Sequence, residues 1–170
     1  MIELVKDEKN KGYIIPYVNY MLAASRRYVD SHKSFDRYEF YIYDGGNIHG
    51  YEKVDILNER MEILSRFNSM LELHGLPVSA AGFESYTCYL GIKNSKKSDN
   101  VGWYGDYLCL KESARKFALE YGVLLLVAAH FFEIGDSEDS MKIPHVHILY
   151  AKPEFEKDCF ARWFVKVSGR

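Results

Sequence analysis

The chain has 170 residues with 22 basic and 24 acidic side chains, which gives a formal net charge of -2 at pH 7. Hydrophobic residues form 48% of the chain and charged residues 27%, and these proportions exclude disordered, collagen-like and coiled-coil proteins. The length suits one domain, so we expect residues 1–170 to fold as a single unit. The longest apolar run, Val123–Ala129, is far shorter than the roughly 20 residues that cross a membrane, so no membrane partner is expected.

The first residues lack the basic start and the apolar block of a signal peptide, which predicts a cytoplasmic protein. The cysteines agree with that location, because they are odd in number and lack the spacing of disulfide frameworks or zinc ribbons. They are Cys88, Cys109 and Cys159, and we expect them to be buried thiols.

The predicted elements alternate between strands and helices from the start of the chain. Residues 2–6 alternate apolar and polar side chains, which predicts a short strand. A helix is expected over residues 16–29, because it opens with a proline, whose missing N–H costs nothing in a first turn. The aromatic alternation of Arg37–Tyr43 predicts a strand that ends at the turn signal Asp44-Gly45-Gly46. Apolar residues near a helical period then predict a helix over residues 54–73.

The second half of the chain continues this alternation. Residues 79–93 and 105–110 read as strands, joined in a long hairpin around a polar loop. An amphipathic helix is expected over residues 111–121. The run 123–132 is apolar except for one histidine, which predicts a central strand buried on both faces. A strand and a helix follow at residues 143–150 and 153–165. This order predicts an α/β or α+β fold with helices packed on one central, antiparallel-rich sheet.

Histidines near the ends of the last two strands form the sharpest chemical pattern. His145 and His147 point to the same side of a strand, roughly 6.5 to 7 Å apart along the chain, and so can bracket one cation. If the preceding strand is a neighbour, His130 faces the same point and Glu133 can add an oxygen. Such ligands suit Mn²⁺, Zn²⁺, Fe²⁺ or a related divalent ion. We expect the cofactor to be Mn²⁺ or Mg²⁺, with Zn²⁺ as a further candidate. The alternative is a set of core histidines without a metal.

The stretch Ala114–Leu149 (ARKFALEYGVLLLVAAHFFEIGDSEDSMKIPHVHIL) combines a helix ending in Tyr-Gly, a strand ending in H-x-x-E and a P-H-hydrophobe-H motif. It resembles the HUH single-strand DNA endonucleases, most closely the plasmid mobilisation relaxases of the MobV and MobQ classes. The resemblance implies an HUH-like fold and an enzyme that nicks and rejoins single-stranded DNA or an origin hairpin. It also implies that His130, His145 and His147 hold the metal, with Glu133 as a ligand or supporting partner.

In this family a tyrosine attacks the scissile phosphate and becomes attached to the 5′ end of the nicked strand, and mobilisation relaxases carry the nucleophile near the N-terminus. The N-terminal helix of this chain offers Tyr17, Tyr20 and Tyr28. Tyr20 is favoured because the positive end of the helix dipole stabilises a phenolate there. Tyr28 remains open, because two adjacent cations lie beside it and lower the pKa of a phenol. These cations are Arg26 and Arg27.

Despite the slightly acidic balance of the whole chain, residues 86–118 contain six basic and three acidic side chains with interleaved aromatics. Such a segment can bind single-stranded nucleic acid through backbone charge and base stacking, although a solvated surface has the same composition. The candidate DNA contacts are Arg26, Arg27, Lys93, Lys96, Lys97, Trp103 and Tyr104.

Two other functions remain open from the sequence. One is an HUH-fold DNA-binding module without turnover, which the acidic balance favours. The other is a histidine-motif nucleotide hydrolase, which needs a third alternating histidine where this chain has Leu149.

Overall fold

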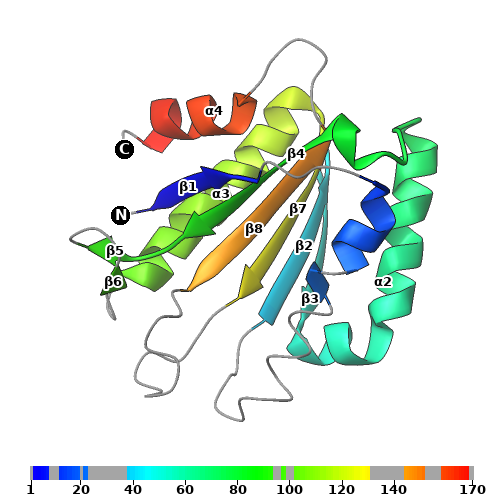
Figure 1. Ribbon diagram of the computed structural model, residues 1–170, viewed down its shortest axis with the longest axis horizontal. Helices are drawn as coiled ribbons and strands as arrows, with labels where there is room; N and C mark the ends of the chain where they lie inside the picture. Colours follow the sequence, from blue (N-terminus) through cyan, green and yellow to red (C-terminus); the bar gives the residue numbers. More distant parts are fainter. Residues whose placement is uncertain are drawn as a thin grey trace.

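The computed structural model describes residues 2–7, 12–19, 21–22, 38–93, 97–98, 102–130, 144–151 and 158–168. Within these residues, six strands form one sheet in the order β1-β4-β8-β7-β2-β3, and neighbouring strands run antiparallel (Figure 1). The strands are β1 (Glu3–Lys6), β2 (Tyr38–Asp44), β3 (Asn47–Glu52), β4 (Phe83–Tyr89), β7 (Leu124–His130) and β8 (His145–Ala151). A small hairpin of β5 (Ile92–Lys93) and β6 (Lys97–Ser98) follows β4.

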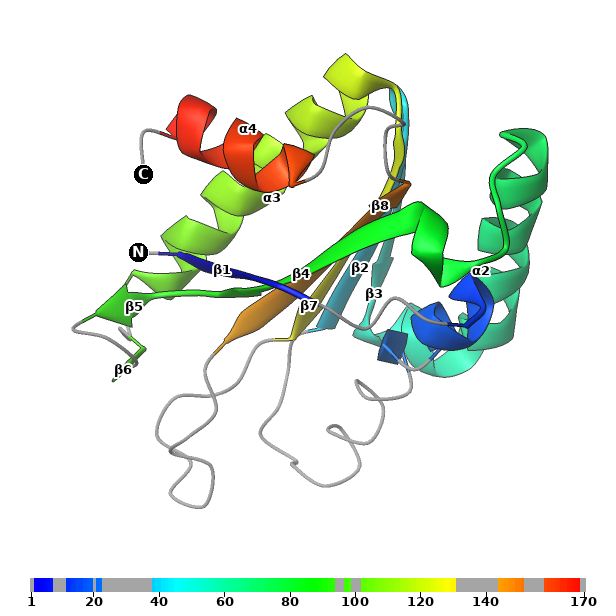
Figure 2. The ribbon, with the colours of Figure 1, turned by 45° about the horizontal axis from the view of Figure 1, so that its top comes forward.

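Helices cover both faces of this sheet. They are α2 (Lys53–Leu73), α3 (Trp103–Tyr121) and α4 (Cys159–Ser168), with a short 3-10 helix at Ala80–Gly82, and residues 14–19 and 21–22 are also helical. Figure 2 shows α3 and α4 on one side of the sheet, and α2 with the N-terminal helical residues on the other. We call these sides the α3 face and the α2 face.

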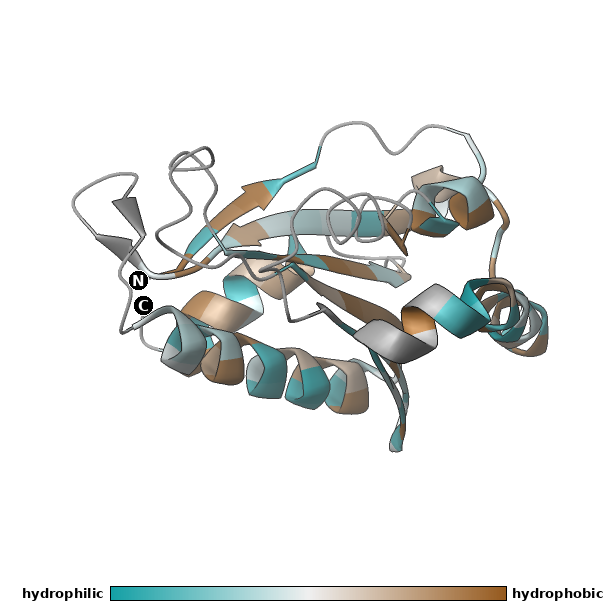
Figure 3. Ribbon diagram, turned by 90° about the horizontal axis from the view of Figure 1, so that it is seen from below, coloured by the Kyte–Doolittle hydropathy of each residue, from teal (hydrophilic) through white to brown (hydrophobic). Residues whose placement is uncertain are grey.

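Each face of the sheet has its own hydrophobic core, because side chains alternate along the strands. In β7, Leu126 and Ala128 pack on the α2 face with the N-terminal helical residues, whereas Val127 and Ala129 pack on the α3 face. This strand is buried along its whole length, as predicted for a central strand. Along the helices in Figure 3, hydrophilic and hydrophobic residues alternate, as expected for helices with one side on a sheet.

The predicted fold class, one central antiparallel sheet with packed helices, is confirmed. The strand expected over residues 105–110 is wrong, and so is the long hairpin that included it. These residues belong to α3, because Tyr107 and Leu110 continue the buried stripe of Ala114 and Phe117 at helical spacing. The helix ends at Gly122, whose φ of 62° is left-handed.

Two further differences from the predicted elements are an additional strand and a later start of the last helix. Strand β3 was not expected, because it lies at the sheet edge and only Tyr51 of its six residues is buried, so it has little hydrophobic periodicity. The last helix begins at Cys159, and the predicted start at Pro153 lies outside the described residues. Among the described residues, no helix has the length and apolar character needed to span a membrane.

Candidate metal centre

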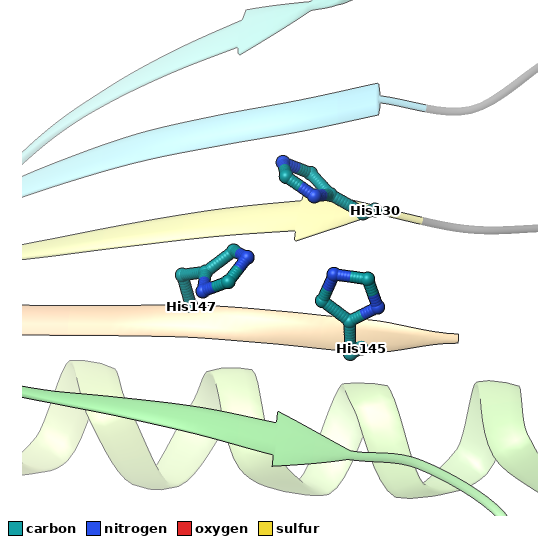
Figure 4. Close-up of side chains that lie close together, drawn as sticks. All are labelled: His130, His145 and His147. Atoms are coloured by element: carbon teal, nitrogen blue, oxygen red, sulfur yellow. The ribbon is translucent and has the colours of Figure 1, made fainter. Parts of the chain in front are cut away.

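Antiparallel pairing of β7 and β8 brings three histidines together. His130 is the last residue of β7 and lies directly opposite His145, the first residue of β8. His147 lies two residues further along β8, opposite Ala128, and therefore on the same side of the sheet. Because Ala128 belongs to the core of the α2 face, all three imidazoles lie on that face (Figure 4). We call them the histidine cluster.

The rings of the histidine cluster are close enough to share one ion. Their centroids are separated by 5.1 Å for His130 and His145, 4.9 Å for His130 and His147, and 5.0 Å for His145 and His147. One nitrogen of each ring lies within 4.8 Å of one nitrogen of both others. Imidazole nitrogens on a single Zn²⁺ lie about 2.1 Å from it, hence at most about 4 Å apart, so small ring rotations complete such a site.

Burial keeps the imidazoles of His130 and His147 in the neutral form that binds metals. His130 is only 6% exposed, and its burial, followed by the neighbouring His147 and His145, holds its pKa well below the usual value. Burial and His145 lower the pKa of His147 to about 4, although the Asp7 carboxylate opposes that shift. Near pH 7 the nitrogen lone pairs of both residues are therefore available to a cation.

Within the described part of the chain, the histidine cluster is the one group of three or more histidine, cysteine or acidic residues whose ligand atoms could meet at a metal ion. Its donors are all imidazole nitrogens, which suit Zn²⁺ and other divalent transition metals and leave coordination positions for oxygen ligands. The predicted convergence of the three histidines therefore agrees with the geometry, and Glu133 lies outside the described residues.

A polar network borders the cluster on β4. Thr87 lies opposite His147 across the β4–β8 pairing, with its Oγ1 3.4 Å from His147 Nδ1. The Thr87 hydroxyl donates to Asp7 Oδ1 at 2.9 Å, and the Ser85 hydroxyl donates to Asp7 Oδ2 at 2.7 Å. Sequence reasoning missed Asp7, because only the β1–β4 pairing brings it here. The alternation of Ser85 and Thr87 with apolar residues was the available signal for a polar strand face.

The N-terminal helical residues lie over the face that carries the histidine cluster. Ile14, Val18 and Leu22 are buried in the same core as Ala128 and Leu149. The candidates Tyr20, Tyr28, Arg26 and Arg27 lie outside the described residues. The helix therefore has the location that the nucleophile prediction requires, while the choice between the two tyrosines stays a prediction.

The candidate DNA contacts divide between two regions. Lys93 and Lys97 are cross-strand partners in the β5–β6 hairpin, which follows β4 close to the cluster, since Leu90 N–H donates to the Pro144 carbonyl beside His145. Lys96 lies outside the described residues. The aromatic candidates open α3 on the other face: Trp103 packs against that core, and Tyr104 is 40% exposed, with the two rings edge-on at 5.6 Å.

Comparisons of the chain with protein-family models, curated proteins and solved structures found no match. The resemblance to HUH endonucleases therefore stays a prediction from the motif. The geometry of the histidine cluster is the observation from which a function can be argued.

Proposed function

We propose that this protein is a divalent-metal-dependent endonuclease that nicks and rejoins single-stranded DNA, in the manner of the HUH relaxases that its histidine motif resembles. The observation that carries the proposal is the convergence of His130, His145 and His147 at one point on the sheet. A H-x-H pair alone is a weak signal, but a third imidazole from the neighbouring strand completes the facial ligand set that such chemistry needs.

The three histidines would hold Mn²⁺, with Zn²⁺ as a further candidate, and Glu133 would add the oxygen ligand that Mg²⁺ prefers, or a supporting contact. A metal bound here would supply Lewis acidity to a non-bridging phosphate oxygen. The lowered pKa values keep His130 and His147 neutral near pH 7, so these two imidazoles bring no charge that would repel the metal.

A tyrosine of the N-terminal helix would be the nucleophile, with Tyr20 preferred over Tyr28. The phenol releases its proton to solvent, and its oxygen forms a bond to phosphorus while the bond between phosphorus and the 3′ oxygen breaks. The 3′ oxygen takes up a proton and leaves as a hydroxyl group, and the reverse attack by that hydroxyl rejoins the strand. The packing of Ile14, Val18 and Leu22 over the α2 face supports this assignment, because attack requires the helix to cross the histidine face.

The single strand would approach from the end of the sheet where β7 ends and β8 begins. The backbone of the β5–β6 hairpin carries Lys93 and Lys97 at that end, and Lys96 lies between them in sequence. We assign these lysines, with Arg26 and Arg27, to phosphate contacts. Trp103 and Tyr104 lie at the start of α3 on the other face of the sheet, so base stacking on them would require the strand to continue around the end of the sheet.

The deciding experiment combines metal analysis with a test for a covalent adduct. The purified protein is incubated with Mn²⁺ or Mg²⁺ and labelled single-stranded DNA, and adducts that survive denaturant are counted on a gel. We expect wild type to form the adduct, His147→Ala to lose metal and adduct together, and Tyr20→Phe to lose the adduct but keep metal. Tyr13→Phe is the matched control, because Tyr13 is 69% exposed and precedes the helical residues.

The results also separate the alternatives. If Tyr28→Phe abolishes the adduct instead, the nucleophile assignment moves to Tyr28. Bound metal with DNA binding and no adduct would replace the proposal by a binding module without turnover. Bound metal with release of a mononucleotide product and no adduct would favour a nucleotide hydrolase.

A further inference from the structure

Asp7 lies at the centre of a hydrogen-bond network that reaches His147. Its two carboxylate oxygens accept hydrogen bonds from two hydroxyl groups on β4, Thr87 at 2.9 Å and Ser85 at 2.7 Å. Thr87 continues the network to His147 Nδ1, and Ser85 continues it to the Tyr17 hydroxyl at 2.9 Å. One carboxylate from the end of β1 therefore joins a residue of the histidine cluster to the N-terminal helical residues.

The direction of each hydrogen bond follows from the number of protons. An ionised carboxylate only accepts, and a threonine hydroxyl has a single proton, which Thr87 gives to Asp7. The Thr87 oxygen can then only accept from its other neighbour, so the Nδ1 of His147 must carry the proton. The other ring nitrogen, Nε2, is left with a free lone pair.

From this geometry we propose that Asp7 is a positioning residue that acts through Thr87 to fix the tautomer and the ring orientation of His147. The inference rests on the proposed metal site, and it assigns Nε2 of His147 as the ligand atom. In Figure 4, one ring nitrogen of His147 points toward His130 and His145, as this assignment requires. A carboxylate behind a histidine ligand also raises the basicity of the ligand and favours a cation at the site.

The second branch of the network provides an internal control. Ser85 gives its proton to Asp7 and therefore accepts from the Tyr17 hydroxyl, so this branch does not pass through His147. Tyr17→Phe removes the hydroxyl that lies 2.9 Å from Ser85 Oγ and 3.4 Å from Asp7 Oδ2. It leaves the path from Asp7 through Thr87 to His147 intact. The two branches can thus be broken separately.

The first test uses the metal-free protein. The tautomer of His147 is read from the nitrogen-15 chemical shifts of its imidazole ring near pH 7. We expect the proton on Nδ1 in wild type and in Tyr17→Phe, and loss of this preference in Thr87→Val, which keeps the branched shape but lacks the hydroxyl. Thr87→Ser keeps the hydroxyl and should restore the wild-type spectrum. A proton on Nε2 in wild type would overturn the assignment.

The second test titrates Mn²⁺ into the same proteins. Loss of a supporting partner of a histidine ligand weakens metal binding by about 10- to 100-fold, and we expect this for Thr87→Val and for Asp7→Asn. Thr87→Ser and Tyr17→Phe should bind like wild type. Unchanged affinity in both Thr87→Val and Asp7→Asn would refute the positioning role.

The same measurements distinguish a failure of the proposed role of Asp7 from a failure of the proposed nicking activity. A wild type that binds Mn²⁺ through this network but forms no DNA adduct would overturn the proposed function and leave the role of Asp7 supported. A wild type that binds no Mn²⁺ overturns the proposed function and the role in metal binding, and the imidazole spectra then decide the tautomer alone.

Discussion

The two faces of the sheet each carry a polar cluster, and the two clusters differ in how their groups satisfy one another. On the α3 face, Glu84 accepts hydrogen bonds from the Tyr150 hydroxyl and from the Asp158 N–H. Lys6 in turn donates to the Asp158 carboxylate at 2.6 Å. We call Glu84, Tyr150, Asp158 and Lys6 the Glu84 cluster. Its acceptors are matched by donors from β1, β8 and the start of α4.

The histidine cluster on the α2 face combines like groups instead. Three imidazoles face one another, and burial, followed by the neighbouring imidazoles, holds the pKa values of His130 and His147 below the usual value. A cation would be attracted to the nitrogen atoms of these two neutral rings. The Glu84 cluster thus pairs its groups within the chain and fastens α4, whereas the histidine cluster has the geometry to hold a metal ion.

The largest expected effect is on metal binding. Replacing His145 or His147 by alanine removes one of three ligands, so we expect loss of measurable Mn²⁺ binding, checked by titration and by metal analysis of the purified protein. The fold should persist, because both histidines lie at the end of the sheet and are only partly buried. Glu84→Gln is the matched control in the other cluster and should bind Mn²⁺ like wild type. Equal metal loss in Glu84→Gln would break the comparison.

The next effect concerns stability. Glu84 is 2% exposed, and Glu84→Ala leaves the Tyr150 hydroxyl and the Asp158 N–H without their acceptor. We expect the free energy of unfolding to fall by about 3 kcal/mol, measured by urea denaturation. Glu84→Gln keeps an acceptor and should cost less. If Glu84→Ala were as stable as wild type but poor in metal binding, the Glu84 cluster would belong to the functional site.

The sequence predicted much of the histidine cluster, for a physical reason. Alternation within β8 puts His145 and His147 on one side whatever the topology. Strands that follow one another in the chain usually pair, which favours the pairing with β7 that adds His130. Asp7 and Glu84 were not foreseen, because each depends on contacts between residues more than 65 positions apart. Local patterns carry no information on such pairs.

The fold was likewise predictable where local patterns determine an element, and not where packing between distant residues determines it. The central strand β7 was predicted because its apolar run requires burial on both faces, and α2 because its periodicity is long. Residues 105–110 were assigned to a strand because their short apolar pattern fits the spacing of a strand as well as that of a helix. They form a helix because Tyr107 and Leu110 then pack into the core of the α3 face.

Acid should destabilise the metal-free protein through the histidine cluster. The pKa of His147 is about 4 in the folded chain and about 6.5 in the unfolded chain. Between these values the unfolded state binds a proton that the folded state does not, so the free energy of unfolding falls as the pH drops from about 6.5 to 4. The shift corresponds to at most about 3 kcal/mol from His147, with a further loss in the same direction from His130.

Urea denaturation at a series of pH values measures this effect. His147→Gln should show a shallower pH dependence than wild type. Phe164→Leu, which removes apolar contacts from the α3 face, should lower stability by a similar amount at every pH. If His147→Gln and wild type had the same pH dependence, the histidine cluster would not be the acid-sensitive part of the molecule.

The salt dependence of DNA binding tests which region of the protein contacts the DNA, and here we expect a small change. Each phosphate neutralised on a single strand contributes about 0.7 to the slope of log affinity against log salt. Lys93→Ala, in the hairpin beside the histidine cluster, should therefore lower the slope by about 0.7, measured by fluorescence anisotropy of a labelled oligonucleotide. Lys116→Ala on α3 is the matched control, since it removes the same charge from an exposed position of the helix that covers the α3 face and should leave the slope unchanged. The reverse result, a lower slope for Lys116→Ala only, would move the DNA path to the α3 face and away from the metal.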